Sequence, residues 1–122
     1  MNTLLIIIGG ALTLLWGVTH LFPTANVVRD FGNISQDNKR IITMEWINEG
    51  ATLIFLGTLV ISLVVIDATG PTAVLVYWMV AGMLVVLAII SLFTGFRVKF
   101  LPFRLCPIIF SGSAILIVLG TI

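Results

Sequence analysis

Apolar residues run along the chain in four long stretches that are separated by more polar connections of different lengths. The stretches cover about residues 3–22, 47–66, 72–95 and 105–122. Each is close to the length of about 20 helical residues that crosses a hydrocarbon core of about 30 Å. None alternates between polar and apolar positions as the strand of a membrane barrel does. The pattern predicts one all-α domain over residues 1–122, an integral membrane bundle of four transmembrane helices.

Local signals refine the ends of these helices. Ser35 is a typical N-cap and Asp37 favours a first turn, so the second helix is expected over 36–66, with its first turns outside the apolar stretch. Pro107 favours a fourth helix that begins near Leu105, because proline is tolerated in a first turn. The first stretch has no basic start and no Ala-x-Ala site after it. We therefore interpret it as a retained helix rather than a cleaved signal peptide.

Composition and charge exclude several classes of protein. Hydrophobic residues make up 60% of the chain and charged residues 9%, against about 45–50% and about 25% in soluble domains. A soluble globule of this size would need more polar surface than these residues supply. The formal net charge is +1. A nucleic-acid-binding protein usually carries a much larger excess of basic residues, so this class is excluded.

The basic residues predict the orientation in the membrane. They occur only in the two connections that follow the first and third apolar stretches: Arg29, Lys39, Arg40, Arg97, Lys99 and Arg104. Two connections separated by two crossings lie on the same side, and the positive-inside rule makes that side cytoplasmic. Both termini are then outside, and the expected location is the plasma (inner) membrane of a bacterium.

Polar side chains on the first two helices predict a pocket in the cytoplasmic leaflet. His20 and Glu49 each lie close to the cytoplasmic end of an apolar stretch, so antiparallel packing places them at the same depth. A carboxylate at this depth is costly unless it is paired or hydrated, which favours an inward orientation. Small residues spaced by four on the first helix, Gly9, Thr13 and Gly17, favour close packing. The expected lining is His20, Glu49, Glu45, Asn48, Thr52 and Trp16.

Two interpretations of this cluster follow from its chemistry. An imidazole beside a carboxylate can hold or relay a proton, or it can bind a polar head group. The alternative is a hydrogen-bonded pair that only holds two helices together. With a single histidine, neither a metal site nor a haem with two histidine ligands is expected, and no cofactor is predicted. Cys106 is alone in the chain and is interpreted as a packing residue.

Two further segments have the composition of the membrane interface. Residues 96–104 mix phenylalanines with Arg97, Lys99 and Arg104, which makes these cations candidates for lipid headgroup contacts, or for an ordinary anchor. Trp46 and Phe31 are interpreted in the same way as anchors. Residues 27–31 are expected to lie flat over the mouth between the first and second helices.

The four-helix layout, with Gly17-x-x-His20 near the end of the first helix, resembles the DoxX-like small membrane proteins. That resemblance implies a quinone or another isoprenoid as a partner. Small multidrug resistance transporters have a similar layout, but they depend on an acidic residue in the first helix, which this chain lacks. Two hypotheses remain foremost: a protein that binds or transforms an amphiphile such as a lipid or quinone, and a structural subunit of a membrane complex or homo-oligomer. Proton-coupled transport ranks last, because the outer halves of the helices offer few polar residues.

Overall fold

The computed structural model describes residues 1–122 and is all-helical. The elements are α1 (Thr3–Leu21), α2 (Thr24–Asp30), α3 (Gln36–Asp67), α4 (Pro71–Phe93), a 3₁₀ helix η1 (Gly95–Arg97) and α5 (Leu101–Thr121). Four helices are long and apolar enough to cross a membrane: α1, α3, α4 extended through η1, and α5. The predicted all-α class and its four long helices are confirmed.

The sequence signals at the helix ends are correct for α3 and wrong for α5. The Ser35 hydroxyl accepts a hydrogen bond from the Asn38 N–H at 3.2 Å, which is the expected N-cap. The last helix begins at Leu101 rather than near Leu105, because Pro102 occupies the first turn. Pro107 therefore lies inside the helix, where it removes a backbone donor and its ring crowds the carbonyl four residues earlier. This earlier start carries Arg104 from the expected loop into a helix.

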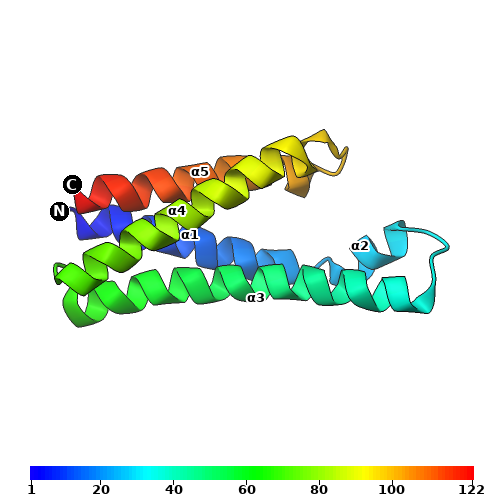
Figure 1. Ribbon diagram of the computed structural model, residues 1–122, viewed down its shortest axis with the longest axis horizontal. Coiled ribbons are helices and arrows are strands. Elements are labelled where there is room, and N and C mark those ends of the chain that lie inside the picture. The colour runs from blue at the N-terminus through cyan, green and yellow to red at the C-terminus, as the bar shows by residue number, and fades with distance from the viewer.

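The long helices run antiparallel, with α1 packed between α3 and α5. Helix α4 packs mainly on α5, and it diverges from α3 with distance from the turn that joins them (Figure 1). Both termini lie at the end of the bundle that holds this turn. The Asn2 N–H donates to the Gly120 carbonyl at 2.7 Å, which joins the two termini. Helix α2 and the α4–α5 connection lie at the opposite end.

Glycines let α1 approach both of its neighbours closely. Gly10 and Gly17 lie opposite Gly57 and Gly50 of α3, and a Cβ atom added at Gly17 would lie 2.8 Å from the Gly50 carbonyl oxygen. Gly9 instead faces α5, where an added Cβ would lie 2.9 Å from a backbone oxygen. The predicted close packing at Gly9 and Gly17 is therefore confirmed, but the two glycines serve two different interfaces. Close backbone approach through small residues is typical of helices that associate in lipid.

Apolar side chains fill the interior and also cover the outside. Tyr77, Phe110 and Leu84 are fully buried between the helices. On the outer surface, large apolar residues such as Phe55 and Leu75 are exposed along the length of α3 and α4. An apolar surface of this extent is unusual for a soluble monomer and is typical of a surface that contacts lipid or another protein.

Candidate functional site

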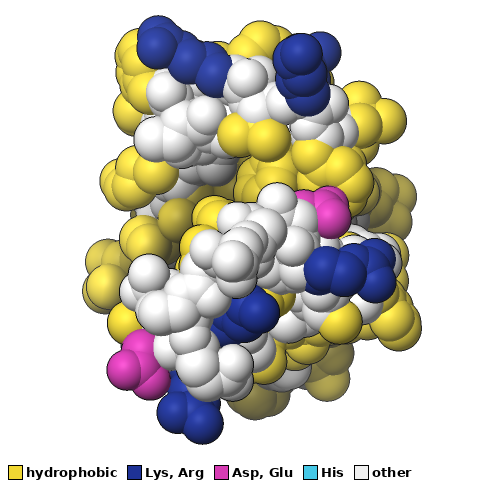
Figure 2. Space-filling model, turned by 90° about the vertical axis from the view of Figure 1, so that its right-hand side faces the viewer, with side chains coloured by type: hydrophobic (Ala, Val, Ile, Leu, Met, Phe, Trp, Pro, Cys, Tyr) yellow, Lys and Arg dark blue, Asp and Glu magenta, His cyan; other side chains and the backbone are white.

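The basic residues gather at one end of the bundle, around a hollow. Figure 2 looks onto the end that carries α2, the start of α3 and the α4–α5 connection, and Lys and Arg side chains lie on both sides of it. Hydrophobic side chains are visible in the hollow between them. The two basic connections therefore lie together at one end of the molecule, as their spacing in the sequence predicted.

A groove with a volume of about 560 Å³ lies where α3 and α4 diverge. Helix α3 supplies all of its polar side chains: Glu45, Asn48, Glu49 and Thr52. Met83 and Leu87 of α4 form the opposite wall, and Phe103 of α5 contributes an aromatic ring. Four of the predicted pocket residues thus share one cavity, because they follow one face of a single helix.

Helix α2 covers the outer end of this groove. Val27 is buried and lines the groove together with Phe31. Residues 27–31 were expected to cover a mouth between the first and second helices, and this is wrong: they belong to α2 and its end and line the groove between α3 and α4. The predicted site between the first and second helices is closed, because the glycine contacts bring α1 and α3 too close together to leave a mouth there.

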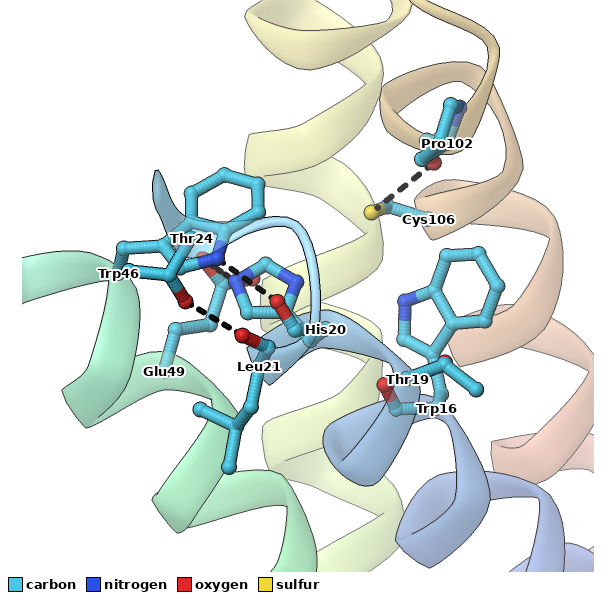
Figure 3. Close-up of polar contacts among 9 residues, drawn as sticks. All are labelled: Trp16, Thr19, His20, Leu21, Thr24, Trp46, Glu49, Pro102 and Cys106. Atoms are coloured by element: carbon cyan, nitrogen blue, oxygen red, sulfur yellow. Dashed lines mark hydrogen bonds and ion pairs between the residues drawn. The ribbon is translucent and has the colours of Figure 1, made fainter. Parts of the chain in front are cut away.

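His20 and Glu49 lie side by side, at the common depth that their positions predicted. The Nε2 atom of His20 is 3.5 Å from Oε2 of Glu49. Figure 3 shows the two side chains next to each other. This distance is long for a hydrogen bond, and Nε2 has no hydrogen-bond partner. The His20 residue is 8% exposed, whereas the Glu49 side chain is 40% exposed and faces the groove. The carboxylate is therefore open to a ligand, with the imidazole behind it.

Trp46 holds this pair in place, a role that the sequence interpretation missed. Its ring stacks on His20 with centroids 3.9 Å apart and planes 16° apart. Its indole N–H donates to the His20 carbonyl at 2.7 Å. Trp46 is only 9% exposed, so its interpretation as an interfacial anchor is wrong. Its position three residues before Glu49 on the same helix face was the signal that pointed inward.

A second, smaller cavity of about 110 Å³ lies on the other side of Trp46 and Phe103, which line both spaces. His20, Trp16 and Cys106 line it. Trp16 was predicted to share a pocket with Glu49, and this is wrong because the Trp46 and Phe103 rings separate the two cavities. The indole nitrogen of Trp16 is buried without a partner. The buried Cys106 thiol donates to the Pro102 carbonyl at 3.4 Å.

The three candidate headgroup residues surround the α4–α5 connection. Arg97 ends η1, Lys99 follows it, and Arg104 lies in the first turn of α5. All three are exposed, and the Arg104 guanidinium donates from Nε to the Val98 carbonyl at 3.2 Å. None of them lines the groove. Their contact with lipid headgroups stays a prediction.

The arrangement combines a polar strip, an apolar wall and an imidazole behind a carboxylate. Such a site can hold the polar head of a ligand at Glu45 and Glu49 while its apolar part lies against α4. No group of three or more His, Cys, Asp or Glu side chains converges in a way that suits a metal ion. Comparison with models of protein families, with curated proteins and with solved structures finds no match to this chain.

Proposed function

We propose that this protein is an integral membrane protein whose groove binds an amphiphile such as a lipid or a quinone. The observation that carries the proposal is the groove of about 560 Å³ between α3 and α4. Its volume is in the range of small-molecule sites, and its walls are mainly apolar with a few convergent polar groups. The quinone is a candidate ligand through the resemblance to DoxX-like proteins, and a lipid through the apolar walls.

The exposed apolar surface and the charge distribution support insertion in a membrane. Large apolar side chains cover the outer faces of the long helices, which suits contact with acyl chains. All six Lys and Arg residues lie in α2, in the first turns of α3, in the α4–α5 connection or in the first turn of α5, and these segments share one end of the bundle. Under the positive-inside rule this end is cytoplasmic, and both termini are outside. The proposed location is the inner membrane of a bacterium.

Single cysteines test this orientation in sealed inverted and right-side-out vesicles. In a Cys106→Ala background, we expect Lys39→Cys and Lys99→Cys to react with a membrane-impermeant maleimide from the cytoplasmic side only. Thr69→Cys, in the turn at the other end, should react only from outside and serves as the control. Labelling of Lys39→Cys and Lys99→Cys from opposite sides would exclude the proposed orientation.

The geometry of the groove orients the ligand. Glu45 lies nearer than Thr52 to the basic end of the bundle, and Leu53 lies deeper still. A polar head is therefore held by the carboxylates of α3, while the apolar body extends towards Leu53 and the α4 wall. Because α3 and α4 diverge, the groove opens sideways, and an amphiphile enters from the cytoplasmic leaflet without leaving the bilayer.

Filling the groove should abolish binding. We expect a photoreactive quinone or diazirine lipid, incorporated in nanodiscs with the protein, to label residues of the groove, as mapped by mass spectrometry. Met83→Trp places a large ring in the groove and should remove this labelling. Met79→Trp is the matched control: Met79 lies one turn away on α4, is exposed and does not line the groove. Equal labelling of the two variants would refute the proposed site.

A second candidate function, a structural subunit, is favoured by an open face of α4 and α5. A groove of about 540 Å³ on this face has a floor of small residues that includes Ala81, Gly82 and Ser111. Nothing lies within 4 Å of a Cβ atom added at Gly82 or Gly112. Close approach of another helix is therefore unobstructed, whether from a second copy or from a larger membrane complex. Absence of groove labelling, with migration as an assembly in mild detergent, would favour this role.

A further inference from the structure

The groove carries two carboxylates that no lysine or arginine neutralises. Glu45 and Glu49 lie one turn apart on α3, and both line the groove. The ion pairs in the molecule are His20 with Glu49 and Arg40 with Asp37, so neither glutamate contacts a lysine or arginine. The basic residues at this end of the bundle do not line the groove either. A ligand in the groove therefore meets local negative charge.

The surroundings of Glu49 leave its oxygens available. His20 is nine-tenths buried in the wall, and its unpartnered Nε2 points at Glu49 (Figure 3). At 3.5 Å the contact is too long to occupy a lone pair of the carboxylate. The stack on Trp46 and the hydrogen bond to the His20 carbonyl keep the imidazole in this position. The carboxylate is thus fixed next to the groove, and its charge is available to a positive head group.

The aromatic residues of the groove suit the same kind of ligand. Three aromatic residues from different elements line the groove: Phe31 at the end of α2, Trp46 of α3 and Phe103 of α5. The face of an aromatic ring attracts a cation, and this attraction is larger where water is excluded. Apolar residues of α3 and α4 complete the walls. Carboxylates, aromatic rings and apolar walls together recognise a positive charge attached to an apolar body.

We infer that the groove selects cationic amphiphiles, that is, ammonium or phosphonium compounds with a large apolar part. This inference rests on the proposed function and specifies its ligand class. Quaternary and protonated amines both carry the required charge. Neutral amphiphiles of equal size lack the attraction to Glu45 and Glu49. Anionic amphiphiles are repelled by these two carboxylates.

Two hydrophobic ions of equal size and opposite charge test the inference. Equilibrium dialysis of the full-length protein in a non-ionic detergent measures binding of tetraphenylphosphonium and tetraphenylborate against empty micelles. We expect saturable binding of the phosphonium and no binding of the borate above the micelle blank. Glu45→Gln/Glu49→Gln should weaken phosphonium binding about tenfold or more, because both charges are lost from a partly dry site. Asp37→Asn, which removes a carboxylate of α3 outside the groove, should leave it unchanged.

The outcomes separate this inference from the proposed function. Equal binding of the two ions, or unchanged phosphonium binding in the double variant, would overturn the cation preference. The proposed function would survive that result if the photoreactive amphiphile still labelled the groove, and it fails if that label is absent. Glu45→Gln alone is the control for misfolding, because the Glu45 side chain makes no hydrogen bond or ion pair within the protein. It should weaken phosphonium binding by about threefold and leave the circular dichroism spectrum unchanged.

Discussion

Replacing Gly57 with leucine is expected to separate α1 from α3 and to prevent the native bundle from forming. A Cβ atom at Gly57 would lie 2.6 Å from the Gly10 carbonyl oxygen and 2.5 Å from the Leu14 backbone nitrogen. These are backbone atoms of a helix, so they cannot move aside as the end of a flexible side chain can. The interface between α1 and α3 is extensive and positions His20 against Trp46. The site should therefore be lost together with the fold.

A smaller substitution at the same position gives a graded effect. Gly57→Ala should reduce the free energy of unfolding by about 1–3 kcal/mol, the usual cost of overpacking. Gly82→Ala is the matched control in α4, where nothing lies within 4 Å of the added Cβ. Its free energy of unfolding should stay constant or rise by at most about 1 kcal/mol, because alanine favours a helix over glycine. Circular dichroism during titration with sodium dodecyl sulfate measures both values. Equal effects of the two alanines would contradict the close packing of α1 on α3.

Replacing Trp46 with alanine should have the second largest effect, a loss of about 3–5 kcal/mol in the free energy of unfolding. The substitution removes the ring that stacks on His20 and that separates the two cavities. It also removes the donor to the His20 carbonyl, one of the carbonyls at the end of α1 that lack a helical partner. Detergent unfolding followed by circular dichroism measures the loss.

Trp46→Phe separates these contributions. Phenylalanine keeps an apolar ring in the same space but has no N–H, so the His20 carbonyl loses its donor. We expect a loss of about 1–3 kcal/mol, the cost of leaving a buried polar group unsatisfied. Trp78→Phe is the control, since Trp78 is 49% exposed on α4, and its effect should stay within about 0.5 kcal/mol. If Trp46→Phe were as mild as the control, the cap on α1 would have no energetic role.

Much of the helical fold follows from local sequence. The apolar stretches predicted the long helices, and the Ser35 cap gave the start of α3 to the residue. The start of α5 was misplaced because either Pro102 or Pro107 can occupy a first turn, and nothing local distinguishes them. Helix α2 was expected only as a flat segment. It is too short to be stable alone, and its one buried residue, Val27, depends on the groove for cover.

The candidate site shows most clearly which features could be predicted from local sequence and which depend on helix packing. Local sequence was enough to place Glu45, Asn48, Glu49 and Thr52 on one face, since the angle between residues of one helix is set by its 3.6-residue period. It also determined that His20 and Glu49 have a similar depth. Which helix that face opposes depends on how the helices pack together. The rotation and tilt of each helix depend on packing against its neighbours, here on glycines that bring α1 against α3 and leave α4 to diverge. That packing opens the groove beside Glu49, turns Trp46 inward and places Trp16 in a separate cavity.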